Sequence, residues 1–198
     1  MRISRIYTPQ PLHTGESLSL EPQASRHLSQ VLRLREGAEL HLFNGNGDAF
    51  CATIASANKK GVELSIGEKL EHSSKESPLE TKLGIGISKG DRMDWLIQKC
   101  TELGVSEIIP LLSERVDVKL PADRMAKKLQ HWQQVAISAG EQSGRNQVPA
   151  ILQPQKLESW VTTVSANKKL VLDFENDDKA TSEDASNSIA LLVGPEGG

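Results

Sequence analysis

Short apolar runs alternate with amphipathic segments of helical length from residue 81 onward. The runs have the length of buried strands: TKLGIGIS at 81–88, VSEIIPLL at 105–112, KKLVLDF at 168–174 and IALLV at 189–193. A strand followed by a helix and then by another strand forms a parallel sheet with helices on its faces. This alternation predicts an α/β fold with a mostly parallel sheet.

The segments between these runs carry apolar residues at helical spacing. One face of 91–104 consists of Met93, Leu96, Ile97, Cys100 and Leu103, and Gly104 is placed to end that helix. A longer helix begins near Pro121, and one of its faces consists of Met125, Leu129, Trp132, Ala136 and Ala139. LESWVTTV at 157–164 predicts a shorter helix. Because Trp95, Trp132 and Trp160 fall on apolar helical faces, we expect all three in the core.

The first 70 residues have a different pattern. Apolar runs flank a turn at 44–47 (NGNG) and a second turn at 58–61 (NKKG), as in antiparallel hairpins. Leu28, Val31 and Leu32 form a short helical stripe before them. The polar segment EHSSKESPLE at 71–80 is typical of a linker. We therefore predict a β-rich domain at 1–72, a linker at 73–80 and an α/β domain at 81–198.

Composition excludes several classes of protein. Apolar residues make up 37% of the chain and charged residues 25%, which is typical of soluble globular proteins. The apolar runs are far shorter than a membrane span, and the first residues, MRISRIYTPQ, lack the apolar core of a secretory signal. The 2 cysteines and 5 histidines show no metal-ligand spacing. We expect a cytoplasmic protein with no membrane association and no metal.

Charge gives a weak indication of an RNA-binding face. The formal net charge is −3, which does not favour nucleic acid. The first 35 residues nevertheless contain Arg2, Arg5, Arg26, Arg33 and Arg35 but only two acidic residues, Glu16 and Glu21. Either a local basic face or ordinary solvated surface charge accounts for this distribution.

Two polar segments are candidates for a site. LLVGPEGG at 191–198 is an apolar run followed by a glycine-rich turn, and ligands of open α/β sheets bind beyond the carboxyl ends of strands. AGEQSGRNQVP at 139–149 places Glu141, Gln142, Arg145 and Asn146 between glycines at the end of a helix. A tight structural turn and a plain helix cap are the alternatives for these two segments.

Four blocks of the sequence belong together in this order: SRHLSQVLRLREG at 25–37, SKGDRMDWLIQKCTELGVSEIIPLLSERVDVKL at 88–120, KKLQHWQQVAISAGEQSGRNQVP at 127–149 and LLVGPEGG at 191–198. They closely resemble the RsmE family of bacterial ribosomal RNA methyltransferases. The resemblance implies a PUA-like β-barrel that binds RNA, followed by a SPOUT domain with a trefoil knot. It also implies a homodimer that uses S-adenosylmethionine to methylate N3 of one uridine in 16S rRNA, in the small ribosomal subunit.

The resemblance also implies roles for particular residues. The cofactor would contact two strand ends, at Leu172, Asp173, Phe174, Val193, Gly194, Pro195, Glu196, Gly197 and Gly198. Arg145 and Gln142 would be catalytic. The sequence does not identify a general base, and Glu141 and Glu196 are named only as guesses. RNA would contact Arg2, Arg5, Arg26, His27, Arg33, Lys89, Arg92 and Arg115.

The family has a third cofactor loop, with the pattern LGxRILRTET, which does not occur in these 198 residues. We therefore expect the knot to be incomplete in this chain, the methyltransferase domain at 81–198 to be truncated, and cofactor binding by residues 1–198 to be weak. The alternative function is a non-catalytic protein of the same fold that binds RNA and dimerises. A small-molecule enzyme of the α/β class is a third alternative, if the resemblance is set aside.

Overall fold

The computed structural model divides the chain into two compact units. Unit 1 consists of residues 1–76 together with 140–148, and unit 2 of residues 77–139 together with 149–198. The structure describes residues 3–59, 61–71, 76–88, 90–112, 121–172 and 187–194. Segment 140–148 thus belongs to unit 1 although it lies far along the chain from residues 1–76.

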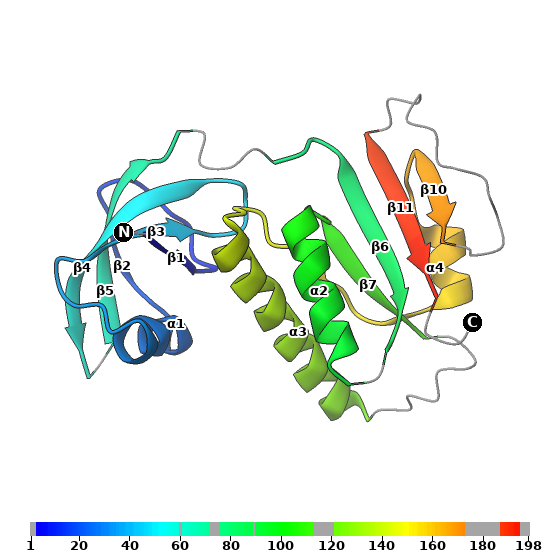
Figure 1. Cartoon of the computed structure of the whole chain (residues 1–198), viewed down its shortest axis with the longest axis horizontal. Coiled ribbons are helices and arrows are strands. Elements are labelled where there is room, and N and C mark those ends of the chain that lie inside the picture. Colours follow the sequence, from blue (N-terminus) through cyan, green and yellow to red (C-terminus); the bar gives the residue numbers. More distant parts are fainter. Residues whose placement is uncertain are drawn as a thin grey trace. The chain divides into compact units, whose positions relative to one another are not determined.

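Unit 1 contains a five-stranded sheet with the order β1-β3-β4-β5-β2 (Figure 1). The strands are β1 (Ser4–Tyr7), β2 (Ser17–Ser19), β3 (Glu39–Phe43), β4 (Ala49–Asn58) and β5 (Gly61–Lys69). β1 pairs with β3 in parallel, and the remaining pairs are antiparallel. Both predicted hairpin turns are confirmed, and Gly45 and Gly47 have the positive φ angles, 86° and 103°, that such turns require.

Alternation along these strands creates the core of unit 1. Every second residue of β5 is buried, namely Val62, Leu64 and Ile66, while the residues between them are more exposed. The buried cluster continues across the sheet through Ile6, Leu40, Leu42, Ala52 and Ile54. The strands of 4–69 thus pair among themselves in a sheet separate from that of unit 2.

A short helical segment, α1 (Pro22–Arg26) followed by η1 (His27–Val31), packs against this sheet through Leu28. Leu34, which follows the segment, packs against the core, whereas the predicted stripe is wrong for Val31, which is 67% exposed, and for Leu32, which is 37% exposed. The reason is a hydrogen bond from Leu32 N–H to the His27 carbonyl, five residues back, which widens the last turn. Arg33 then ends the segment with φ of 55°.

Unit 2 contains a parallel sheet with the order β10-β11-β6-β7-β8, and β9 also pairs with β7. The strands are β6 (Glu80–Gly86), β7 (Glu107–Leu112), β8 (Ala150–Ile151), β9 (Gln155–Lys156), β10 (Lys168–Val171) and β11 (Ser188–Val193). All the pairs are parallel, so the predicted fold class is confirmed for this unit.

Helices α2 (Arg92–Leu103), α3 (Ala122–Ser143) and α4 (Leu157–Thr163) accompany this sheet (Figure 1). Trp160 of α4 packs against one face of the sheet, on Ile109, Leu111 and Ala190. The Trp160 indole packs on Gly84 of β6. Only glycine fits at position 84, because a Cβ there would lie 2.6 Å from a carbon of the indole ring. In the part of the chain that the structure describes, no helix is both long and apolar enough to cross a bilayer.

The apolar faces predicted for the helices are confirmed in part. Met93, Ile97, Leu129, Trp132 and Ala136 are buried, and Gly104 ends α2 with φ of 90°. Two residues of α2 differ from the prediction: Trp95 is 63% and Leu103 is 82% exposed. Trp132 and Trp160 lie in the core as expected, but the sequence-based placement of Trp95 is wrong. Helical spacing identifies a face without showing what packs on its edges.

Candidate functional site

Three parallel strands of unit 2 end at the same edge of the sheet. β11 lies between β6 and β10, with Val193 paired to Ile85 and Val171 paired to Leu192. In the sheet, β7 and β8 lie on one side of β6, and β11 and β10 lie on the other side. The direction in which successive strands are added therefore reverses between β6 and β11. Ligands of open α/β sheets bind outside the carboxyl ends of strands at such a reversal.

The residues predicted to bind a cofactor come to this edge where the structure describes them. Leu172 follows β10, donates its backbone N–H to the Leu192 carbonyl at 2.9 Å, and is 61% exposed. Val193 ends β11, and Gly194 follows with open space where a side chain would begin. The predicted contacts Asp173, Phe174 and 195–198 lie outside the described residues. Among the described residues, this edge presents apolar surface beside the open backbone of Gly194.

The polar segment 140–148 is anchored in unit 1 through Asn146. α3 ends at Ser143, and Gly144 takes a φ of 85°, as a helix end with glycine predicts. Asn146 is fully buried, and its Nδ2 donates to the Gly47 carbonyl at 3.1 Å. Gly47 N–H in turn donates to the Asn146 carbonyl at 3.4 Å. The segment is thus held against the turn between β3 and β4.

Arg5 of β1 binds the same segment. Its Nη2 donates to the Arg145 carbonyl at 3.2 Å and to Asn146 Oδ1, and its guanidinium lies 4.9 Å from the centre of the Phe43 ring. Burial lowers the pKa of Arg5, while the charges of Glu141 and Glu76 act in the opposite direction. Arg5 was expected to contact RNA, and the structure shows that its Nη2 has two acceptors within unit 1, whereas its buried Nε has no partner among the described residues.

Glu76 binds the same segment. Its carboxylate forms an ion pair with the Arg145 guanidinium, and the two side chains are only 13% and 19% exposed. Glu76 Oε1 also accepts the backbone N–H groups of Asn146 and Gln147, at 3.0 Å and 3.2 Å. The sequence does not reveal this role, because Glu76 stands in a polar, linker-like stretch 69 residues from its partner.

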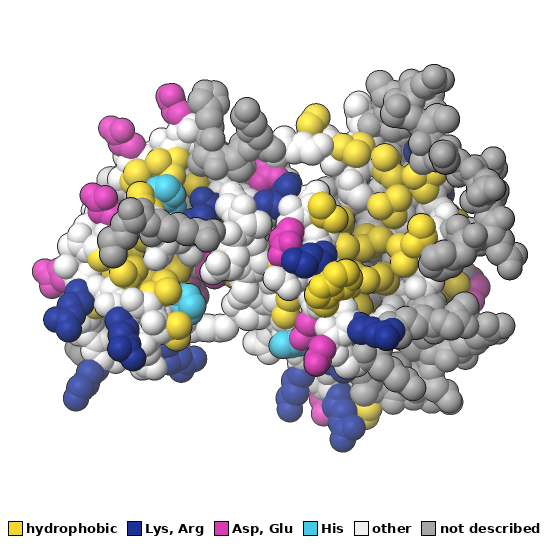
Figure 2. Space-filling view, viewed as in Figure 1, with side chains coloured by type: hydrophobic (Ala, Val, Ile, Leu, Met, Phe, Trp, Pro, Cys, Tyr) yellow, Lys and Arg dark blue, Asp and Glu magenta, His cyan; other side chains and the backbone are white. Residues whose placement is uncertain are grey.

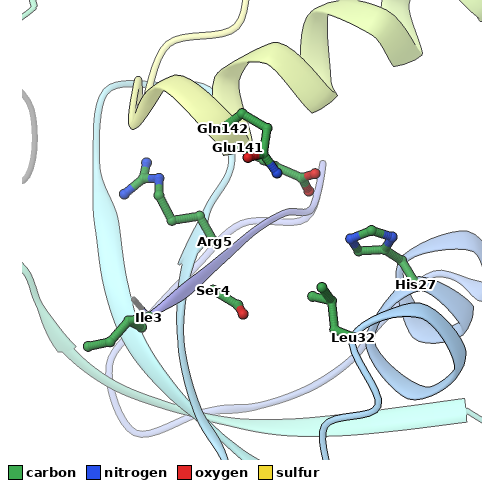
Figure 3. A pocket seen from close by; sticks show the side chains of 7 residues that line it. All are labelled: Ile3, Ser4, Arg5, His27, Leu32, Glu141 and Gln142. Carbon is green, nitrogen blue, oxygen red and sulfur yellow. The ribbon is translucent and has the colours of Figure 1, made fainter. Parts of the chain in front are cut away.

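A pocket with a volume of about 130 Å³ lies within unit 1 (Figure 3). It is lined by Ile3, Ser4, Arg5, His27, Leu32, Glu141 and Gln142. Glu141 Oε1 accepts the Tyr7 N–H at 3.0 Å. Burial raises the pKa of Glu141, and the Tyr7 N–H and the charges of His27 and Arg5 partly offset that effect. The fold thus brings together His27, an expected RNA contact, and Gln142, an expected catalytic residue.

The other expected RNA contacts occupy two places. Arg26 and Arg33 are exposed on α1 and just after η1, and Figure 2 shows basic side chains gathered around α1 in unit 1. Arg92 is exposed at the start of α2 in unit 2. Arg2, Lys89 and Arg115 lie outside the described residues. Arg26 and Arg33 are thus accessible from solvent, as a residue that contacts a phosphate must be.

Comparisons with known proteins agree with this architecture. Residues 75–198 match the family described as "RNA methyltransferase domain", and residues 20–67 match "RNA methyltransferase PUA domain". The chain is 33% identical over 199 residues to ribosomal RNA small subunit methyltransferase E of Buchnera aphidicola from Schizaphis graminum, an alignment that covers 100% of this chain and 80% of the relative.

Two solved structures are similar over the whole chain. One is ribosomal RNA small subunit methyltransferase E from Neisseria gonorrhoeae bound to S-adenosyl methionine, with 38% identity, a TM-score of 0.91 and coverage of 100% of this chain and 81% of that one. The other is described as a methyltransferase from Legionella pneumophila in complex with SAM, with 40% identity, a TM-score of 0.88 and coverage of 100% and 82%. The chain therefore belongs to the RsmE family of RNA methyltransferases, with an N-terminal PUA-like β domain and a parallel-sheet methyltransferase domain.

Proposed function

We propose that this protein transfers the methyl group of S-adenosylmethionine to N3 of one uridine in 16S rRNA, in the cytoplasm and during assembly of the small ribosomal subunit. The similarity across the whole chain to ribosomal RNA small subunit methyltransferase E carries this proposal. The proposal includes the PUA-like β-barrel and the SPOUT-type fold that the family resemblance implies. Its domain limits are 1–72 and 81–198 along the sequence, and segment 140–148 of the second domain packs within unit 1.

The edge formed by β6, β10 and β11 fits this cofactor. Leu172 and Val193 offer apolar surface to an adenine ring, and Gly194 has room beside its backbone for a ligand. We assign binding to these three residues and to the family contacts at 173–174 and 195–198. The bound cofactor supplies an electrophilic methyl group on a sulfonium.

The proposed chemistry requires a nucleophile that uracil lacks at neutral pH. Its N3 is a weak acid that must lose a proton before it attacks a methyl carbon, and negative charge then develops on the ring oxygens. Hydrogen-bond donors fixed near those oxygens favour that step. Arg145 and Gln142, which lie on one segment, are our candidates, and holding N3 in line with the methyl group accounts for further acceleration.

Methyl transfer to intact small ribosomal subunits tests the proposal directly. The full-length protein should transfer label from S-adenosylmethionine to subunits that lack this methylation and not to fully methylated subunits. The modified base should prove to be 3-methyluridine when the RNA is digested and analysed by mass spectrometry. RNA binding without any transfer would instead support the non-catalytic alternative.

A homodimer is the second part of the proposal. In unit 2, two apolar side chains of α2 are exposed, Trp95 at 63% and Leu103 at 82%. Val171 at the end of β10 and Leu172 after it are exposed as well. Figure 2 shows hydrophobic side chains gathered over α2 and the strands beside it. Exposed aromatic and aliphatic side chains of this kind are typical of subunit interfaces, and a second copy of the chain is the partner that the family implies.

Light scattering should give twice the mass of one chain for the full-length protein. Trp95→Asp is expected to weaken the dimer at least tenfold, because it places a charge in an apolar interface. Gln98→Asp, an exposed residue of the same helix, is the matched control and should leave the dimer intact. A wild-type protein that is monomeric at micromolar concentration would contradict this part of the proposal.

A further inference from the structure

The pocket of unit 1 has one feature that a phosphate site lacks. A carboxylate, Glu141, forms part of its wall beside the Gln142 amide (Figure 3). A phosphate group would bring its own negative charge against Glu141 in a partly buried space, where like charges repel strongly. The Nη2 of Arg5 already donates to the Arg145 carbonyl and Asn146 Oδ1, but the guanidinium keeps its charge, and among the described residues its buried Nε has no partner. A carboxylate and a guanidinium in one lining suit a neutral group with both donors and acceptors better than a phosphate.

The pocket does suit a group that donates hydrogen bonds. Within the described residues, the structure shows one hydrogen bond to the Glu141 carboxylate, from Tyr7 N–H to Oε1 at 3.0 Å. Its second oxygen can accept from a ligand. The hydroxyl of Ser4 adds a polar group, and Leu32, 37% exposed, offers apolar surface to a flat ring (Figure 3). A nucleobase combines a flat ring with a polar edge, whereas phosphate and ribose do not.

We propose that this pocket takes one base of the substrate RNA, and that the base carries an exocyclic amino group. The inference rests on the proposed function, because it assumes that RNA is the ligand of unit 1. The Glu141 carboxylate would accept a hydrogen bond from the amino group of cytosine, adenine or guanine, as acidic side chains accept from cytosine N4 in other complexes. Uracil offers only its ring N3–H as a donor, and this N–H stands between two carbonyl oxygens that a carboxylate repels. We therefore expect the pocket to prefer a base with an exocyclic amino group over uracil.

Fluorescence anisotropy with synthetic 12-mers tests the selection. The full-length protein should bind oligocytidine about tenfold more tightly than oligouridine, since one such base contact discriminates by about that factor. Glu141→Gln keeps the shape of the side chain and an oxygen for the Tyr7 N–H. The substitution replaces a carboxylate, which only accepts hydrogen bonds, by an amide that also donates them. The amide N–H can donate to a uracil carbonyl, so the variant should bind uracil better than the wild-type protein does. We expect this variant to reduce the ratio of affinities to about one.

Arg26→Ala is the matched control, since Arg26 is an exposed cation of the same unit. It should weaken binding of both 12-mers equally and lower the slope of log affinity against log salt by about 0.7, whereas Glu141→Gln should leave that slope unchanged. A wild-type ratio near one, or a ratio that Glu141→Gln does not change, overturns the inference. Methyl transfer to small ribosomal subunits, measured separately, shows whether the proposed function fails as well.

Discussion

Arg145→Ala is expected to lower kcat for methyl transfer about 100-fold while changing the affinity for RNA less than threefold. Removal of one fixed donor to a developing oxyanion typically costs this much in rate. An interaction that strengthens only in the transition state affects kcat more than ground-state binding. Single-turnover kinetics on undermethylated small subunits, with RNA affinity measured in parallel, gives both quantities.

The contacts of Arg145 determine which control this experiment needs. Arg145→Ala leaves the Glu76 carboxylate, whose side chain is 13% exposed, without its cationic partner. A loss of rate could then arise from a displaced segment rather than from a missing donor. The double variant Arg145→Ala with Glu76→Gln removes the unpaired charge and keeps an acceptor for the N–H groups of Asn146 and Gln147. The double variant should remain about 100-fold slow.

Arg33→Ala supplies the opposite pattern. Arg33 is exposed after η1, so its loss should weaken RNA binding and reduce its salt dependence with little effect on kcat. If Arg145→Ala and Arg33→Ala both reduce binding and neither reduces kcat, Arg145 is a phosphate contact and our catalytic assignment fails.

Glu76→Ala is expected to lower the free energy of unfolding by about 3 kcal/mol or more. The change leaves the mostly buried Arg145 guanidinium without its partner, and breaking a buried pair from one side typically costs about 3–5 kcal/mol. It also removes the acceptor of two backbone N–H groups. Denaturation by urea, followed by tryptophan fluorescence and by circular dichroism, measures the effect and shows whether the units unfold together.

Two variants show whether the cause is the buried pair. Glu80→Ala removes a carboxylate whose side chain is 49% exposed and which pairs with Lys82 at 3.3 Å, and it should change stability by less than about 1 kcal/mol. In a double-mutant cycle, Glu76→Ala and Arg145→Ala should be strongly non-additive, because either change alone leaves one charge unpaired. Additive effects would mean that the two side chains do not stabilise the protein through each other.

The local pattern of the sequence was enough to predict the classes of structure in this protein. Alternation of period two predicts the strands of unit 1, and the change to helical spacing after residue 81 predicts the parallel sheet of unit 2. Gly104 ends α2 as predicted, because a residue in the left-handed region at that position is nearly always glycine. These features depend on neighbours within one or two turns of chain, and a single sequence contains that information.

Partners distant along the chain were decided by the tertiary structure alone. The exposure of Trp95 depends on which elements pack beside α2, and helical spacing does not specify them. Arg5 seemed a solvent-facing arginine, yet it bonds to a segment 140 residues away, and Glu76 seemed part of a linker, yet it pairs with Arg145. A charged side chain in a sequence has many oppositely charged candidates at similar separations. The folded chain selects one of these pairings, because it excludes water from the two charged side chains and from the N–H groups beside them.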